Sequence, residues 1–215
     1  MSWTPLTRQE IAANVGRDLP DGACVNLGIG MPTLVADNLP PGIEIIIHSE
    51  NGVLGVGPKP LPGLEDPELI DAGKDFITLL KGASFFHHTD SFLMMRGGHI
   101  DIAVLGSFQV SQSGDLANWA TADTNYPPAV GGAMDLAVGA KKIFVMTTHT
   151  TKEGTPKLLK NCSFPLTAKG VVSSVYSDLA TVDIRDGRMH VRYMVPNLTE
   201  EELQSKTDAE LIFDV

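Results

Sequence analysis

The sequence predicts an α/β fold, a single domain with a mainly parallel open sheet covered by helices and with a hairpin and a helix at its C-terminal end. Strand-like apolar runs alternate with segments of helical spacing between residues 7 and 146, which is typical of parallel strands joined by crossover helices. The runs at 43–47 and 100–105 are rich in apolar residues, as expected of strands buried on both faces. Glycine-rich turns follow two of the expected strands, and this is where α/β sheets bind ligands.

The first third of the chain contains clear helix and strand signals. Thr7 and Glu10 form a capping box, and helical spacing then continues to a stop at 20–22. The elements expected next are a strand at 23–27, a helix opened by Pro32 and a strand at 43–48.

Between residues 57 and 63, prolines and glycines exclude regular structure, so we expect an exposed loop that covers a site or meets a partner. The elements expected after this loop are a strand at 76–80, a helix at 84–96, a strand at 100–105, a short helix at 133–138 and a strand at 142–146.

The last third predicts a hairpin and a terminal helix. Two strand-like runs, 179–184 and 188–193, flank Asp186-Gly187, a strong turn signal. Thr199 and Glu202 form a second capping box for a helix that reaches Lys206. The length fits one domain spanning residues 1–215.

Composition excludes several classes of function. A net charge of -10 leaves no basic patch for nucleic acid or an anionic membrane. The two cysteines suggest no disulfide framework, and no apolar run approaches the ~18 residues of a membrane span. The six histidines lack the spacing of a metal site, so we expect no metal. A cytoplasmic protein without a signal peptide fits these features.

Glu50 is the main catalytic candidate. It ends an apolar strand and enters a glycine-rich turn with Asn51 and Gly52, where the backbone can approach a ligand closely. A carboxylate held in such a turn can act as a nucleophile or a base. Serine or thiol catalysis is less favoured, because neither Ser49 nor the cysteines stand in a nucleophile motif.

Two glycine turns offer main-chain N–H groups to an anion or an oxyanion. Gly28, Ile29 and Gly30 precede the helix opened by Pro32 and begin like a dinucleotide fingerprint, but Thr33 stands where the third glycine should be, which argues against a nicotinamide or flavin site. Gly131 and Gly132 form the second turn, which could also be only a tight bend.

Two other polar positions allow more than one interpretation. His87 and His88 fit a polar helix start, with a place in the substrate pocket as the alternative. Arg96 fits a solvated cation at the end of a helix.

Five motifs together resemble the B subunits of the 3-oxoacid coenzyme A transferase family. They occur in the expected order over nearly the whole chain, at 26–34, 49–52, 96–101, 114–119 and 131–136. The resemblance implies the coenzyme A transferase fold, which is NagB-like, and a catalytic glutamate at Glu50. It also implies that the turns holding Gly30 and Gly131 supply oxyanion donors.

The resemblance implies a mechanism as well. Glu50 attacks an acyl-coenzyme A, and a mixed anhydride is converted into a glutamyl-coenzyme A thioester that a second acid then attacks. Coenzyme A enters as a thioester substrate, and no cofactor is expected. Such intermediates hydrolyse easily, so the site must exclude water.

A partner A subunit is also implied, in a hetero-oligomer of the A2B2 type. In single-chain relatives this region corresponds to the C-terminal half, and the glycine-rich loop that helps to hold coenzyme A belongs to the other half.

The stretches 85–92 and 127–132 resemble the branch that transfers coenzyme A from succinyl-coenzyme A to 3-oxoadipate. Acetoacetate is the alternative acceptor, although the Pro-Gly-Lys stretch typical of that branch is missing. Arg96 or a group on the partner is a candidate to bind the distal carboxylate of the substrate. An acyl-coenzyme A hydrolase and a non-catalytic regulatory subunit are the competing functions.

Overall fold

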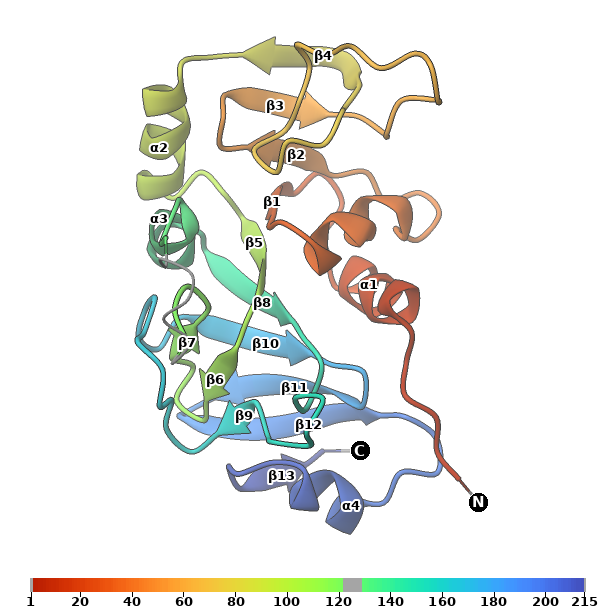
Figure 1. Cartoon of the computed structure of the whole chain (residues 1–215), viewed down its shortest axis with the longest axis vertical. Helices are drawn as coiled ribbons and strands as arrows, with labels where there is room; N and C mark the ends of the chain where they lie inside the picture. Colours follow the sequence, from red (N-terminus) through yellow and green to blue (C-terminus); the bar gives the residue numbers. More distant parts are fainter. Residues whose placement is uncertain (1, 122–128, 215) are drawn as a thin grey trace.

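One long sheet organises the molecule. The structure, a computed structural model, describes residues 2–121 and 129–214. Within these residues a 10-stranded sheet has the order β13-β12-β11-β10-β8-β5-β1-β2-β3-β4 (Figure 1). The five central strands all run parallel, and they are β10 (Val172–Tyr176), β8 (Lys142–Met146), β5 (Ile102–Gly106), β1 (Cys24–Leu27) and β2 (Ile46–Ser49). Their carboxyl ends therefore meet at one edge, as the predicted fold class requires.

Strands of mixed direction extend the parallel core at both ends. On one side β2 pairs antiparallel with β3 (Val53–Val56), which pairs antiparallel with β4 (Leu79–Phe85). On the other side β11 (Ala180–Arg185) and β12 (Arg188–Met194) form the predicted hairpin. Its turn has positive φ at Asp186 and Gly187, 52° and 70°, as a type I′ turn requires. The final strand, β13 (Leu211–Phe213), pairs parallel with β12.

Helices cover both faces of the parallel core (Figure 1). One face packs against α1 (Arg8–Arg17) and the 3-10 helix η1 (Met31–Asp37), and the other against α2 (His88–Arg96) and α3 (Ala133–Gly139). The buried side chains alternate along β5, because Ile102 and Val104 face α1 whereas Ala103 and Leu105 face α3. This alternation explains why the sequence of β5 is apolar throughout.

A second, small sheet and a terminal helix lie against the second face. The three strands of the sheet are β7 (Leu116–Ala117), β6 (Gln109–Ser111) and β9 (Leu158–Leu159). Leu203 of α4 (Glu200–Ser205) joins the same hydrophobic core as Leu116 and Leu158. The sequence gives little signal for strands of two or three residues, and none of these three strands was predicted.

The capping boxes at Thr7 and Thr199 are both present, but several element boundaries were predicted wrongly, among them the strand expected from residue 43, which begins at Ile46. The strand expected at 76–80 is β4, which begins at Leu79, and the helix expected from residue 84 begins at His88. Pairing of Val53 with Phe85 keeps residues 84–85 in the sheet. Tertiary pairing thus outweighs the local preference.

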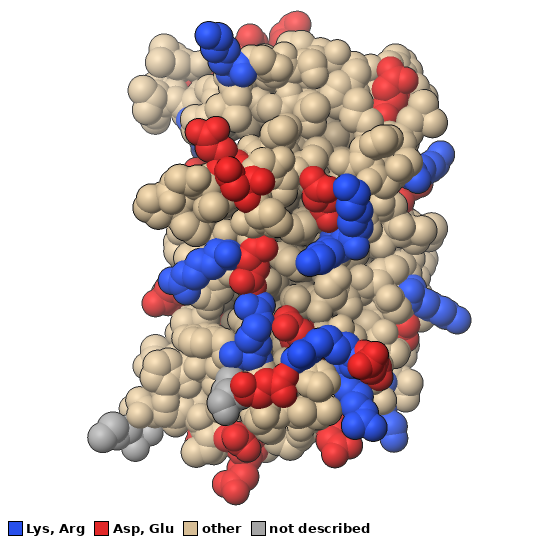
Figure 2. Space-filling view, turned by 180° about the vertical axis from the view of Figure 1, so that it is seen from behind, with Lys and Arg blue, Asp and Glu red and all other residues tan. Residues whose placement is uncertain are grey.

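The described residues contain no helix long and apolar enough to cross a membrane. On the face of the molecule that Figure 2 shows, lysine and arginine side chains are interspersed with acidic ones and form no basic patch.

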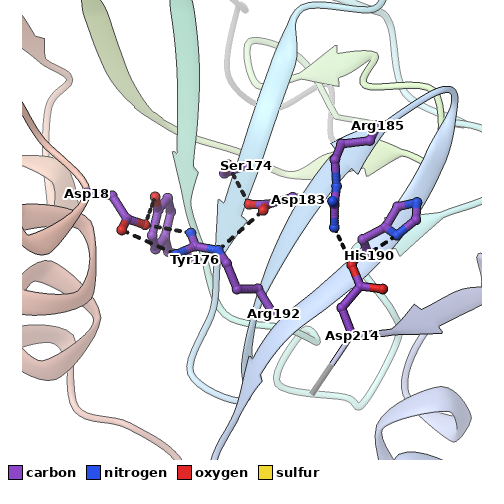
Figure 3. Close-up of polar contacts among 8 residues, drawn as sticks. All are labelled: Asp18, Ser174, Tyr176, Asp183, Arg185, His190, Arg192 and Asp214. Carbon is purple, nitrogen blue, oxygen red and sulfur yellow. Dashed lines mark hydrogen bonds and ion pairs between the residues drawn. The ribbon is translucent and has the colours of Figure 1, made fainter.

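A polar network ties α1 to the far end of the sheet (Figure 3). Asp18, which caps the C-terminus of α1, accepts a hydrogen bond of 2.6 Å from the Tyr176 hydroxyl and bonds of 3.2 and 2.5 Å from the Arg192 guanidinium. Arg192 also contacts Asp183 at 3.3 Å. The hydrogen bond from Arg192 to Asp18 raises the pKa of the guanidinium further, so the pair stays charged.

We predict that Asp18→Ala lowers the free energy of unfolding by about 2 kcal/mol, because the buried Tyr176 hydroxyl and Arg192 both lose an acceptor. Urea denaturation of the purified chain measures this loss. Asp186→Asn removes the same charge at the hairpin turn, where asparagine is equally suited, and should leave the midpoint within experimental error. Equal stability of the two variants would show that the network contributes nothing.

Candidate active site

A cavity of about 890 Å³ opens at the carboxyl edge of the parallel core. The ends of four neighbouring strands line it, and the residues that follow them are Gly28 after β1, Glu50 after β2, Ser107 after β5 and Thr147 after β8. The sheet order therefore brings together side chains from distant parts of the sequence.

The turn that carries Glu50 is fixed by its glycine. Gly52 has φ of 111°, and a Cβ atom there would lie 2.2 Å from the carbonyl oxygen of Phe86, so no other residue fits. The Gly52 N–H donates to the Ser49 carbonyl (3.0 Å), and the Gly52 carbonyl accepts from the Phe86 N–H (3.0 Å). Gly52 therefore shapes the turn and does not itself line the cavity.

Side chains on both sides of Glu50 hold the loop that follows β3 against the site. Asn51 donates its side-chain amide to the Ile70 carbonyl at 2.7 Å, and the Ser49 hydroxyl accepts from the Ala72 N–H at 2.9 Å. Ala72 and neighbouring residues of this segment line the cavity. This later part of the segment contributes to the cavity wall, whereas no residue of the loop at 57–63 lines the cavity, and Asn51 acts through the segment without lining the cavity itself.

The carboxylate of Glu50 lies directly against Gly132. A Cβ atom on Gly132 would come within 1.9 Å of Glu50 Oε2, so the carboxylate occupies space that only a glycine leaves free. Gly131, with φ of +55°, lines the cavity beside it. Residues 127–128 of the motif that contains this turn lie outside the described residues, whereas 129–132 all line the cavity.

The other predicted glycine turn lies on the same cavity. Gly28 and Ile29 line it, and Ile29 is 74% exposed. Gly30 has φ of +90° and turns the chain into η1, without lining the cavity itself. The structure thus brings both glycine turns and Glu50 to one site.

Partial burial makes the Glu50 carboxylate a stronger base. Loss of solvent raises the pKa of Glu50, nearby His88 opposes this shift, and Asp135 adds to it. Within the described residues, no ion pair involves this carboxylate. A half-buried carboxylate that no ion pair holds is the state expected of a catalytic group.

Asn26 is a cavity residue that was not singled out from the sequence. It is 5% exposed, at the end of β1, and its side-chain amide lies 3.1 Å from His48 Nδ1 and donates to the His48 carbonyl at 3.1 Å. His48 Nε2 contacts the Ser91 hydroxyl at 2.9 Å. Only the sheet register, which aligns Asn26 with His48, reveals this chain of contacts.

The remaining sequence candidates lie outside the cavity lining. His87 accepts from the Thr89 N–H and caps α2, whereas the ring of His88 lies 4.8 Å from that of Phe92. Arg96 pairs with Asp135 at 2.6 Å and is mostly exposed. Neither the two histidines nor Arg96 lines the cavity. A search of the described residues finds no cluster of metal-ligating side chains.

Comparison with known proteins gives a consistent result. The family model described as coenzyme A transferase matches residues 8–206. The B subunit of the 3-oxoadipate CoA-transferase of Acinetobacter baylyi is 53% identical over 99% of this chain and 98% of its own length. The B subunit of the enzyme of the same name from Pseudomonas putida is 54% identical over 96% of this chain and 97% of its own length.

Another relative carries a different substrate in its name. The B subunit of a probable succinyl-CoA:3-ketoacid coenzyme A transferase of Bacillus subtilis is 48% identical over 94% of both chains.

Solved structures share the fold at low identity. An acyl-CoA transferase of Escherichia coli O157:H7 matches with a TM-score of 0.71 and 16% identity. The match covers 100% of this chain, which spans 43% of the length of that protein. Glutaconate coenzyme A-transferase of Acidaminococcus fermentans matches with a TM-score of 0.68 and 17% identity, over 98% of this chain and 88% of that one.

Two buried neutral histidines should make the free energy of unfolding depend on pH. Burial lowers the pKa of His48 and of His149 to about 4. The unfolded chain takes up protons on these rings near their ordinary pKa of ~6.5, so it binds more protons than the folded chain between the two values. The free energy of unfolding should therefore fall as the pH drops from about 6.5 to about 4.

Urea denaturation at a series of pH values measures this slope. His149→Gln should make the slope shallower, because one of the two buried rings is removed, whereas substitution of the exposed His99 by Gln should leave it unchanged. The same slope in all three proteins would contradict the assignment.

Proposed function

The chain belongs to the coenzyme A transferase family, and from this premise we propose that it is the B subunit of an enzyme that moves coenzyme A from succinyl-coenzyme A to a 3-oxoacid, most favourably 3-oxoadipate. The observation that carries the mechanism is the contact of the Glu50 carboxylate with Gly132 inside the cavity. The names of the relatives at 53% and 54% identity support 3-oxoadipate as the acceptor. Acetoacetate is the alternative, because relatives at 47–48% identity are named for 3-ketoacids.

The proposed reaction begins at a Glu50 carboxylate oxygen. This oxygen attacks the thioester carbonyl of succinyl-coenzyme A, the carbon–sulfur bond breaks, and a mixed anhydride and the coenzyme A thiolate result. The thiolate then attacks the side-chain carbonyl of Glu50 and releases succinate. The 3-oxoacid reverses these steps and leaves as its coenzyme A thioester. Coenzyme A enters and leaves as a substrate, and the cycle uses no separate cofactor.

The main chain around Glu50 suits the charge that develops in these steps. Each attack produces a tetrahedral oxyanion. N–H donors that are already held in place stabilise this oxyanion more than they stabilise the uncharged carbonyl of the ground state. The turns at Gly28–Gly30 and Gly131–Gly132 are the nearest candidates to supply them. The segment held by Ser49 and Asn51 forms part of the cavity wall, and in the proposed mechanism it helps to exclude water from the acyl intermediates.

Exposed apolar side chains on the outer strand support a protein partner. Residues of β4 are exposed on both faces of the sheet, and among them Leu79, Leu80 and Phe85 have exposed fractions of 36%, 45% and 65%. An apolar edge strand open to water is a hazard unless another protein covers it. We propose that an A subunit does so, in an A2B2 assembly, as the subunit names of the relatives suggest.

A reducing compartment such as the cytoplasm is proposed for this assembly. Cys24 and Cys162 are both free, and burial raises the pKa of each thiol to about 11. Both are therefore protonated and unreactive at neutral pH.

We predict that Glu50→Gln lowers the rate of coenzyme A exchange by at least ~10³-fold, since the nucleophile is lost. The free energy of unfolding of this variant at neutral pH should rise slightly. Folding raises the pKa of Glu50 above its value in the unfolded chain, so the ionised carboxylate destabilises the folded state, and glutamine removes this effect. Exchange in the reconstituted two-subunit enzyme and urea denaturation of this chain measure the two effects. Undiminished exchange would disprove the role of Glu50.

Trapping the intermediate separates the competing functions. The complex is mixed with succinyl-coenzyme A, treated with hydroxylamine or borohydride, and digested for mass spectrometry. A transferase gives a modified Glu50 and coenzyme A bound to the acceptor. A hydrolase gives free acid without transfer to the acceptor, and a regulatory subunit gives no adduct.

We further predict that Gly132→Ala lowers exchange by 10-fold to 100-fold while the fold is kept. The new methyl group would occupy the place of the Glu50 carboxylate, a flexible group that can move aside, and a small displacement of a reacting atom has a large effect on rate. The backbone at residue 132 has φ of -81°, which alanine adopts without strain. Full activity, or loss of folding, would contradict this prediction.

A further inference from the structure

We propose that Lys157, together with the hydroxyls of Thr148 and Ser107, binds the distal carboxylate of the dicarboxylic substrates. This inference rests on the proposed function, and it assigns the residues that distinguish a dicarboxylic from a monocarboxylic 3-oxoacid. Arg96, the cation considered from the sequence, is paired with Asp135 and does not line the cavity.

Hydrogen bonds fix both the main chain and the ammonium group of Lys157 in the cavity wall. Its N–H donates to the His149 carbonyl (3.1 Å) and its carbonyl accepts from the Val110 N–H (2.9 Å), so its main chain is fixed on both sides. Its ammonium group donates to the hydroxyls of Thr148 (2.8 Å) and Thr147 (3.3 Å), which follow β8. A charged group held in one place by such contacts binds an anion with little loss of side-chain entropy.

The charge of Lys157 has no carboxylate partner among the described residues. Lys157 is half-buried, and loss of solvent lowers its pKa, with Asp178 opposing the shift. The other cations that line the cavity in the described chain, Arg8 and Lys152, are exposed. A partly dehydrated cation gains more from a bound anion than a solvated one does.

Ser107 adds an unused hydrogen-bonding group at the same end of the cavity. Its carbonyl accepts from the Thr147 hydroxyl at 3.2 Å, which places it beside the threonines that contact Lys157. Its own Oγ atom is buried and has no hydrogen-bond partner within the described residues. Buried hydroxyls are nearly always paired, so a ligand oxygen is a suitable partner.

Glu50 and Lys157 line one cavity from different parts of the sheet. Glu50 contacts Gly132 at the start of α3, α3 packs on β5, and β8 is the neighbour of β5. Glu50 follows β2 and the threonines follow β8, with β1 and β5 between them, which is roughly 14 Å at ~4.8 Å per strand. The five carbon–carbon bonds of 3-oxoadipate extend about 6 Å. The Glu50 side chain already reaches from β2 to the start of α3, and in the proposed complex the substrate and the Lys157 side chain bridge the remaining distance.

The test compares two acceptors with the same carbon skeleton in the reconstituted two-subunit enzyme. 3-Oxohexanoate has a methyl group in place of the distal carboxylate of 3-oxoadipate. In a double-displacement reaction, kcat/KM for the acceptor reports only the second half-reaction. The quantity measured is therefore the ratio of kcat/KM for 3-oxoadipate to kcat/KM for 3-oxohexanoate.

We expect Lys157→Met to lower this ratio by 10-fold to 100-fold, mainly through KM for 3-oxoadipate. Lys157→Arg should restore part of it. Ser107→Ala, which breaks no hydrogen bond of its hydroxyl within the described chain, should lower the ratio by about 3-fold to 10-fold. Lys160→Met removes the same charge from an exposed position outside the cavity and should leave the ratio unchanged.

An equal loss for both acceptors would overturn the proposal, because it would mean that Lys157 binds coenzyme A or only supports the structure. An unchanged ratio in Lys157→Met and Ser107→Ala would overturn it as well. Labelling of Glu50 by succinyl-coenzyme A in the wild-type enzyme distinguishes failure of this inference from failure of the proposed function. Normal labelling with an unchanged ratio refutes this inference alone, whereas absence of labelling refutes the proposed function.

Discussion

The contact between the Glu50 carboxylate and the main chain at Gly132 is the constraint on which the site depends. The carboxylate lies where a Cβ atom would otherwise be, so it reaches the start of α3 only because residue 132 is a glycine. The turn that aims Glu50 requires a second glycine at 52, which lies against the Phe86 carbonyl. Two positions without side chains, far apart in the sequence, thus fix the place of one functional group.

This arrangement opposes the stability of the folded chain, because burial raises the pKa of Glu50 and makes its ionised form less favourable. The rest of the fold compensates with rigid support around the cavity. The parallel strands carry continuous cores on both faces, and Asp18, Tyr176 and Arg192 join the first helix to the hairpin. A rigid frame with a destabilised group at its edge is common in enzymes.

Local chemistry explains which parts of the structure could be predicted from the sequence. The capping box at Thr7 and the turn at Asp186 depend on neighbours within a few residues, and both were predicted correctly. Both ends of β4 were predicted wrongly, because pairing of Val56 with Leu79 and of Val53 with Phe85 decides them. Glu50 could be found because a strand followed by glycine is itself a local pattern. Lys157 and Ser107 have no such pattern. Pairing of β5 with β8 and main-chain bonds of Lys157 to His149 and Val110 bring them to the cavity.

The order of the strands also suggests how one site can combine a reaction common to all acyl-coenzyme A thioesters with selection of one acid. In the proposed mechanism, Glu50 and the two glycine turns surround the reacting carbonyl, a group that every acyl-coenzyme A shares. Ser107 follows β5, and Lys157, which precedes β9, contacts the threonines that follow β8; in our proposal they bind the far end of the substrate. Because these two sets stand on different strands, a change at Lys157 can alter the choice of acid without moving Glu50. Under this proposal, substrate choice is separable from reactivity, as expected of sites built from loops on a rigid sheet.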